Sequence, residues 1–223
     1  LLYSCRILKI SFFEDKETIF NILNELIKKN DICNGSVKIH ISRAGGGRYN
    51  PESNDYNILI SSSEGDVFID NESVSVCVFR DELKTKYNLS TIKSSSALIP
   101  ILASIYAKEN SFNNALLLNT ENNIVEATNS NIFIFKKDTL HTPPITDGCV
   151  AGTMRDWIIR NYNVIETSIA ISDLEKSSEV FMCNAINGII AIKSIYLDKD
   201  RSIIYRKKYA QIIQKRLISL SEG

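Results

Sequence analysis

Three short apolar segments follow one another between residues 114 and 136, and turn residues separate them. They read NALLLN, IVEAT and NIFIFK. Apolar runs of this length, bounded by Asn, Thr and Ser, are typical of β-strands joined by turns. One carboxylate, Glu126, interrupts the middle segment. Glu126 is therefore either a solvated turn residue or a carboxylate that is held in a closed site.

Alternating patterns before these segments predict both helix and strand. Apolar residues recur on one helical face over residues 16–30, and they alternate with polar residues over 36–43. Further strands are expected over 55–61 and 73–79. A helix is expected over 94–110, with serines available as its N-cap and with Pro100 as a possible kink.

The second half of the chain continues the mixture of strands and helices. TLHTPPITDGCVAG is predicted to be a loop that is rich in Pro and Gly, and TMRDWIIRNY is predicted to be a helix. The strands VIETSIA and EVFMC follow, with the acidic turn SDLEKSS between them. After the apolar run GIIAI, an amphipathic helix closes the chain. The fold class is therefore mixed α/β.

The polar stretch SSSEGD at residues 61–66 is the predicted linker between two domains. We expect a small N-terminal α/β domain at residues 1–65 and a larger domain at residues 66–223. The 223 residues provide enough chain for this arrangement.

Composition excludes several classes of function. The 26 Lys and Arg residues balance the 26 Asp and Glu residues, so nothing favours nucleic acid or an acidic membrane as a partner. Five cysteines without a short ligand spacing, several of them in apolar runs, predict buried reduced thiols and a cytoplasmic protein. With two histidines, a metal site is not expected.

Four pieces of sequence carry potential chemistry, and each has an ordinary structural interpretation. Lys93 precedes a predicted helix among small residues, where an amine is activated as a nucleophile, but most lysines are surface residues. Gly152 opens another helix and is either a phosphate cradle or a packing glycine. Asn184 and Ala185 end an apolar strand and either meet an anion or form a simple turn. Together with Glu126, these pieces match what pyridoxal 5'-phosphate requires.

Residues 115–159, from ALLLNTENNIVEATNSNIFIF to VAGTMRDWII, resemble the signature of class IV aminotransferases almost throughout. These are the fold-type IV pyridoxal-phosphate enzymes, and they include branched-chain and D-amino acid aminotransferases and 4-amino-4-deoxychorismate lyase. Weaker resemblance extends from RAGGGRYNP to SSEVFMCNAINGIIAI. The resemblance implies a two-domain, D-amino acid aminotransferase-like fold, with the larger domain binding the cofactor. It also implies a homodimer.

The resemblance assigns roles by position. Lys93 would form the Schiff base and move the proton at Cα, and Glu126 would bind the pyridine nitrogen. Asn129, Ser130 and Asn131 would lie beneath the ring, and Arg43 and Arg48 would be candidates for a substrate carboxylate. The residues that would bind the phosphate are Gly152, Thr153, Met154, Asn184 and Ala185.

The chain departs from the family pattern in three places. The family's phosphate-binding arginine comes just before a Leu-Leu-like pair and would fall immediately before Leu1, so we expect the chain to be an N-terminally truncated piece of a longer protein. Leu98 stands where branched-chain enzymes carry tyrosine, as in the lyases and D-amino acid enzymes. Ser96 stands where those two groups usually carry asparagine.

Transfer of an amino group between an amino acid and a 2-oxo acid is the activity that the resemblance favours. The alternative is the lyase reaction of folate biosynthesis, which releases pyruvate and 4-aminobenzoate from aminodeoxychorismate. A second alternative is a catalytically inactive binding protein of the same fold.

Overall fold

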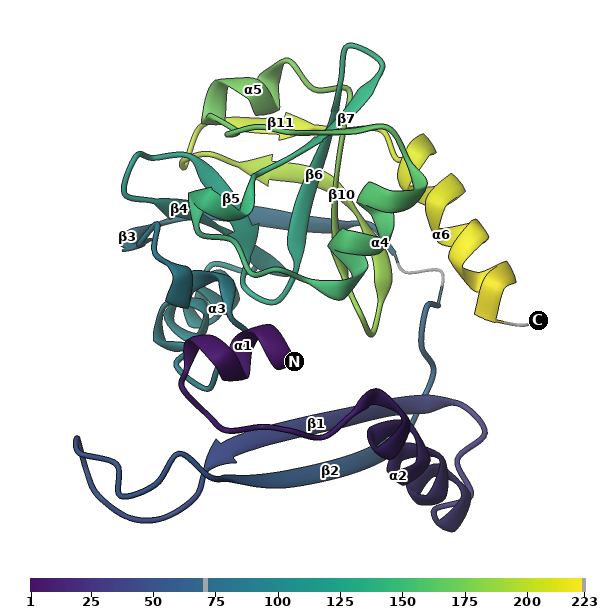
Figure 1. Cartoon of the computed structure of the whole chain (residues 1–223). Coiled ribbons are helices and arrows are strands. Elements are labelled where there is room, and N and C mark those ends of the chain that lie inside the picture. Colours follow the sequence, from purple (N-terminus) through teal and green to yellow (C-terminus); the bar gives the residue numbers. More distant parts are fainter. Residues whose placement is uncertain (70–71, 222–223) are drawn as a thin grey trace. The chain divides into compact units, whose positions relative to one another are not determined.

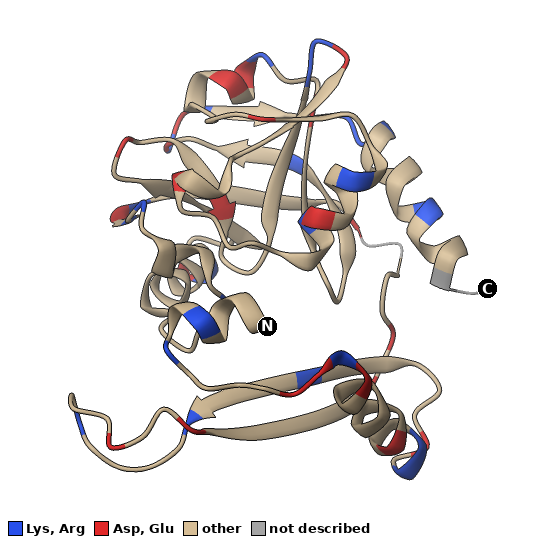
Figure 2. Ribbon diagram, viewed as in Figure 1, with Lys and Arg blue, Asp and Glu red and all other residues tan. Residues whose placement is uncertain are grey.

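The computed structural model describes residues 1–69 and 72–221, and its contacts divide the chain into two compact units. Unit 1 is Leu1–Val67 and unit 2 is Phe68–Gly223, a division two residues beyond the boundary predicted from sequence. Figure 1 shows the elements of each unit. Along the ribbon, Lys and Arg positions are interspersed with Asp and Glu positions in both units (Figure 2).

Unit 1 is a β-hairpin with two helices. The strands β1 (Gly35–Arg43) and β2 (Tyr56–Glu64) pair antiparallel along their full lengths. Helix α2 (Lys16–Lys29) begins at Asp15, whose carboxylate accepts a hydrogen bond of 2.7 Å from the Thr18 N–H. Helix α1 (Leu2–Ile7) precedes it. Residues 61–64, expected to be linker, instead complete β2, because they pair with the first residues of β1.

Unit 2 is built on strands that close into a ring. Strand β10 pairs with β3 and β9, and the path continues through β4, β5 and β6 back to β9. These six strands therefore form a small barrel, and β7, β8 and β11 extend the sheet beyond it. The bounds are β3 Val74–Lys84, β4 Asn114–Asn119, β5 Ile124–Ala127, β6 Asn131–Lys136, β7 Thr139–Thr142, β8 Val164–Glu166, β9 Glu179–Asn184, β10 Gly188–Tyr196 and β11 Ser202–Ile204.

Successive side chains along the barrel strands point alternately into the barrel and away from it, which separates an inner core from outer layers. On β6, Ile132 and Ile134 belong to one buried cluster, whereas Phe133 and Phe135 belong to another. The first cluster also takes alternate residues of β3, β4, β9 and β10, so it fills the barrel interior. Because both faces of these strands are buried, their sequences read as continuous apolar runs.

Helices cover the outside of the barrel strands (Figure 1). Ala103 and Ala107 of α3 (Leu98–Glu109) pack against β3 and β4. Helices α4 (Thr153–Asn161) and α6 (Lys208–Ser221) pack together against β6, β9 and β10. The buried Glu179 carboxylate of β9 accepts hydrogen bonds of 2.8 and 2.6 Å from the Tyr209 and Ala210 N–H groups, which holds the start of α6. Burial raises the pKa of Glu179.

Most predicted elements are confirmed, and several local predictions are wrong. Helix α3 starts at Leu98, not at residue 94, and its N-cap is Ala97 without a side-chain hydrogen bond. Pro100 lies in the first turn, where an N–H has no intrahelical partner, so it causes no kink. The acidic turn after residue 170 is the short helix α5 (Ile171–Glu175), and the predicted Pro/Gly-rich loop begins with strand β7.

The described residues contain no helix that combines the length and apolarity required to cross a membrane. They also contain no cluster of three or more His, Cys, Asp or Glu side chains that would hold a metal ion. Two short helical turns complete the inventory, η1 (Asn88–Thr91) and η2 (Ile145–Asp147).

Candidate active site

Glu126 is a buried carboxylate at a β-bulge in β5. It pairs with Leu117, but Ile124 pairs with the next residue of β4, Leu118, so Val125 is an extra residue. A bulge breaks the alternation of side chains and re-aims its neighbours. Val125 and Leu117 both belong to the outer cluster beneath α3. The bulge therefore places Glu126, which is 5% exposed, on this outer side of the barrel.

Both oxygens of the Glu126 carboxylate have partners. The Val150 N–H donates a hydrogen bond of 2.7 Å to Oε2. The Lys84 ammonium, at the end of β3, forms an ion pair with Oε1 and is 8% exposed. A buried carboxylate needs such partners because an unpaired charge is costly to remove from water. Glu126 is therefore a fixed, buried anion rather than a solvated turn residue.

Residues 150–152 form hydrogen bonds to three segments of the site that lie well before them in the sequence. The Val150 carbonyl accepts a hydrogen bond of 2.8 Å from the Asn131 side chain, and the Ala151 N–H donates one of 3.0 Å to the Thr91 carbonyl. With the bond to Glu126, this segment touches β5, the start of β6 and η1. Three distant parts of the chain thus meet at one turn.

Gly152 is required where this segment enters α4. A Cβ atom built on Gly152 would lie 2.1 Å from Oδ1 of Asn131, a distance at which one of the two groups must move. The glycine therefore allows the backbone to approach Asn131 closely. Close packing is thus the role that the structure shows for Gly152, and its part in a phosphate cradle stays a prediction.

Lys93 lies two residues beyond Thr91, the residue that the Ala151 N–H binds. Its side chain is exposed, whereas Thr91 and Ile92 are buried. The buried pair fixes the backbone that leads to Lys93 and leaves the amine accessible. The structure thus places the Lys93 segment and Glu126 against the same turn.

Three of the predicted phosphate residues, Gly152, Thr153 and Met154, form the start of α4. No side chain caps this helix, so its first N–H groups are available to an anion, and the helix dipole favours one there. Thr153, Met154 and Ala185 line one cavity of about 360 Å³ together with Trp157 of α4. Phe68, Leu217 and Leu220 form its remaining apolar wall. The turn that enters α4 and the turn that follows β9 are therefore neighbours.

Asn129, Ser130 and Asn184 form a hydrogen-bonded group beside this cavity. The Asn184 amide donates to the Ser130 hydroxyl at 3.0 Å, and that hydroxyl donates to Asn129 Oδ1 at 3.0 Å. Asn184 Oδ1 accepts from the Ile186 and Asn187 N–H groups, which shapes the turn after β9. The side chain of Asn184 is thus used within the protein, and its backbone remains the part proposed for phosphate.

The two arginines predicted for a substrate carboxylate differ in their surroundings. Both belong to unit 1. Arg43 donates to the Leu8 and Lys9 carbonyls and to the Asn54 side chain, so it holds the N-terminal segment against the end of β1. Arg48 lies exposed in the glycine-rich loop. Its role as a carboxylate ligand stays a prediction, as does that of Arg43.

Sequence reasoning missed three polar residues that build this site. Lys84 binds Glu126, and buried Asn114 accepts bonds from the N–H and hydroxyl of Thr128, which fixes the turn before Ser130. Buried Arg155 donates to the Pro143 carbonyl at 2.8 Å and pairs with Glu166, which anchors α4. A polar residue at an end of an otherwise apolar strand was the signal available for Asn114, whereas Lys84 follows the charged run at residues 80–82 and gave no such signal.

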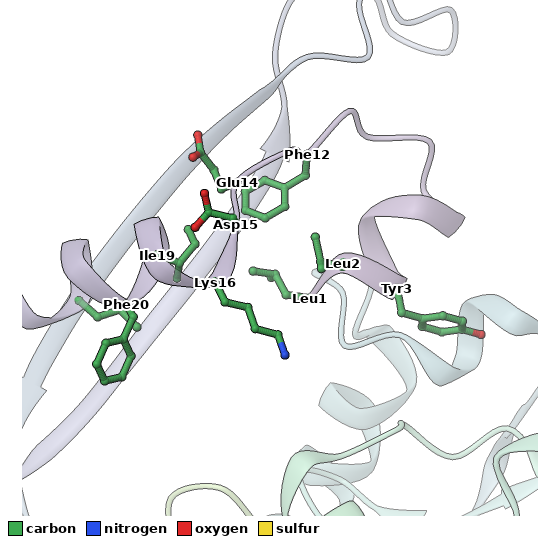
Figure 3. A pocket seen from close by; sticks show the side chains of 10 residues that line it. Leu1, Leu2, Tyr3, Phe12, Glu14, Asp15, Lys16, Ile19 and Phe20 are labelled. Atoms are coloured by element: carbon green, nitrogen blue, oxygen red, sulfur yellow. The ribbon is translucent and has the colours of Figure 1, made fainter.

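A second cavity of about 360 Å³ lies within unit 1, between α1 and α2. Figure 3 shows Leu2, Phe12 and Ile19 among its lining side chains, with Lys16 beside them. None of the site residues predicted from sequence lines this cavity. The cofactor residues predicted from sequence all belong to unit 2.

The chain is similar in sequence to characterised relatives and in fold to solved structures. The aminodeoxychorismate lyase of Vibrio harveyi is 26% identical over 199 residues, which are 85% of this chain and 73% of that protein. Branched-chain-amino-acid aminotransferase 1 of Arabidopsis thaliana is 31% identical over 103 residues, 43% of this chain and 27% of that protein. The crystal structure of the Thermoproteus uzoniensis branched-chain aminotransferase superposes with a TM-score of 0.87 at 21% identity, covering 99% of this chain and 76% of that one.

Residues 1–195 match the family described as amino-transferase class IV. This match spans most of both units, including Lys93, Glu126 and the turn at residues 150–152. The chain belongs to the class IV aminotransferase family.

Proposed function

We propose that this protein is a pyridoxal 5'-phosphate-dependent aminotransferase whose attachment lysine is Lys93. The observation that carries the proposal is the turn at residues 150–152, which joins Glu126, Asn131 and the segment before Lys93. Bound pyridoxal phosphate supplies an aldehyde that condenses with amines and a ring that accepts electrons. The protein's own residues then bind, orient and move protons.

The residues present fit this cofactor. A carboxylate offers about four acceptor sites, and Lys84 and Val150 use one on each oxygen of Glu126, so a ring N–H can still be accepted. The uncapped start of α4 offers N–H groups to the phosphate, with Ala185 lining the same cavity. Gly152 keeps this helix start close to Asn131. Charge and hydrogen-bond donors therefore match both ends of the cofactor.

Lys93, rather than Lys84, is the lysine suited to bind the aldehyde. The aldehyde of the cofactor lies across the ring from its nitrogen. Lys84 is already paired with the carboxylate that we assign to the nitrogen, so its ammonium lies at the opposite end. Lys93 is exposed and carries no such pairing in the described structure. Its amine can both hold the cofactor and move a proton at the substrate Cα.

A 4-amino-4-deoxychorismate lyase is the second candidate, and one observation favours it. The Vibrio harveyi lyase is 26% identical over 85% of this chain, whereas the branched-chain aminotransferase of Escherichia coli is 21% identical over 86%. Both reactions use the same lysine to remove a proton from Cα. They differ in their products, because transamination yields a 2-oxo acid, whereas the lyase reaction yields pyruvate and 4-aminobenzoate. The substrate test below separates them.

Homodimer formation is part of this proposal. Leu98, Ile101 and Ile105 are 74%, 53% and 48% exposed and lie on one face of α3 with Leu102. An apolar helix face of this kind marks a protein–protein contact. We assign a second copy of the chain to it.

A cytoplasmic location is proposed as well, because all five cysteines are free thiols and four are buried.

Lys93→Ala should abolish cofactor attachment while leaving the fold intact, because Lys93 is exposed. Wild-type protein that has been mixed with pyridoxal phosphate, treated with borohydride and freed of unattached cofactor under denaturing conditions should keep a near-ultraviolet absorption band that Lys93→Ala lacks. Turnover should fall by about 10²–10⁴-fold, the range for loss of a positioned acid–base group. Lys108→Ala on α3 serves as the matched control. An identical band in Lys93→Ala, or no band in the wild type, would refute the assignment.

The substrate assay compares two incubations of the wild-type protein. An amino donor with a 2-oxo acid should yield the exchanged pair, and aminodeoxychorismate alone should remain unchanged. Formation of pyruvate and 4-aminobenzoate without any 2-oxo acid would instead establish the lyase. If neither incubation gives product while the absorption band is present, the binding-protein alternative stands.

Sedimentation measurements test the dimer. The wild-type protein should sediment at twice the 25.1 kDa mass of one chain. Leu102→Glu should sediment as a monomer, because it places a charge within the apolar face of α3. The control Ile204→Glu changes an exposed residue of β11 and should stay dimeric. A monomeric wild type, or a dimeric Leu102→Glu variant, would contradict this interface.

A further inference from the structure

The buried ion pair between Lys84 and Glu126 places an extra positive charge at the candidate active site. The two side chains are 9% and 6% exposed, and they come from β3 and from the bulge of β5. The Lys84 ammonium also lies 3.5 Å from the Ser90 carbonyl, at the start of the segment that leads to Lys93. This lysine is therefore fixed between the carboxylate and η1.

A ring nitrogen does not need this ammonium in order to bind Glu126. A carboxylate alone would attract a protonated ring nitrogen strongly, because opposite charges interact strongly where water is excluded. The Lys84–Glu126 pair is neutral as a whole, so it attracts a second cation less than the bare carboxylate would. The ammonium and the protonated ring nitrogen compete for one negative charge.

We propose that Lys84 is a positioning residue that shares the Glu126 carboxylate with the cofactor ring nitrogen and lowers the pH up to which that nitrogen keeps its proton. This inference rests on the proposed function. Its physical basis is that a nearby like charge disfavours a cation. The lysine also orients the carboxylate, because it fixes Oε1 while the Val150 N–H fixes Oε2.

Other charged and titratable groups near the pair do not account for such an effect. Burial raises the pKa of the Cys149 thiol to about 11, so this thiol stays neutral through the neutral pH range. Arg155 is committed to Glu166. Lys86 pairs with Glu121 and Asp147, so this group carries a net negative charge and would favour a protonated ring nitrogen rather than oppose it. Lys84 is thus the cation in direct contact with Glu126.

The test measures protonation of the ring nitrogen directly. Pyridoxamine 5'-phosphate that is ¹⁵N-labelled in the ring is bound to the protein, and its ¹⁵N resonance is followed from pH 5.5 to 9.5. This probe has no aldehyde and cannot attach to Lys93. In Lys84→Met and Lys84→Gln, the midpoint of the titration should move upward by at least about one pH unit. Lys84→Arg keeps the charge and should restore the wild-type midpoint.

Each outcome decides between distinct accounts. A wild-type protein that does not bind the probe would refute the proposed function together with this inference. Binding with the same midpoint in all four proteins would refute the inference alone. Gln is included because its amide can still donate to Glu126 if Met destabilises the fold. If both neutral variants fail to fold while Lys84→Arg folds, the ammonium serves folding alone and the inference is wrong.

Discussion

The hydrogen bond from the Val150 N–H to the Glu126 carboxylate joins the two halves of the proposed cofactor site, because it ties Glu126 to the turn that enters α4. Val150 is the first residue of a turn. The second, Ala151, donates a hydrogen bond to η1, and the third, Gly152, is the N-cap of α4. If this turn moved, Glu126 would lose a partner and the start of α4 would lose its place beside Asn131. One short turn therefore sets the relations among residues that lie up to 60 positions apart in the sequence.

The barrel explains why these contacts can be held. Its interior is filled by alternate residues of six strands, and the other faces are covered by helices, so the strand ends have little freedom. Within this frame the bulge at Val125 provides the necessary irregularity. It allows a carboxylate to occur in an apolar strand and still point away from the apolar interior. Lys84 offsets the charge that is buried as a result.

Local pattern was sufficient to predict the strands and helices around Glu126 and Gly152, because apolar runs and turn residues have local physical causes. Closure of the barrel was not predictable in this way. It depends on the pairing of β9 with both β6 and β10, and the apolar pattern of a strand does not specify its partners. The bulge was missed because IVEAT has no Gly or other local signal for one. Lys84 was missed because its partner lies 42 residues away.

The resemblance to class IV aminotransferases supplied residue roles that pattern alone left open. Lys93 would otherwise have been one exposed lysine among several, and its importance follows from its connection through Thr91 to the turn at Ala151. For Arg43, the resemblance suggested a ligand of a substrate carboxylate; its guanidinium binds the Leu8 and Lys9 carbonyls, and its role toward a substrate stays a prediction. A motif identifies which residues to examine, and the contacts show how each is used.

The cofactor affinity of Gly152→Ala tests most directly whether this turn organises the site. The added Cβ would displace Asn131 or the turn itself. We expect the dissociation constant for pyridoxal phosphate to rise at least about tenfold, a loss of about 1.4 kcal/mol, while the barrel stays folded by circular dichroism. Asp156→Ala, an exposed change on the same helix, should bind as the wild type does. Wild-type affinity in Gly152→Ala would contradict the account.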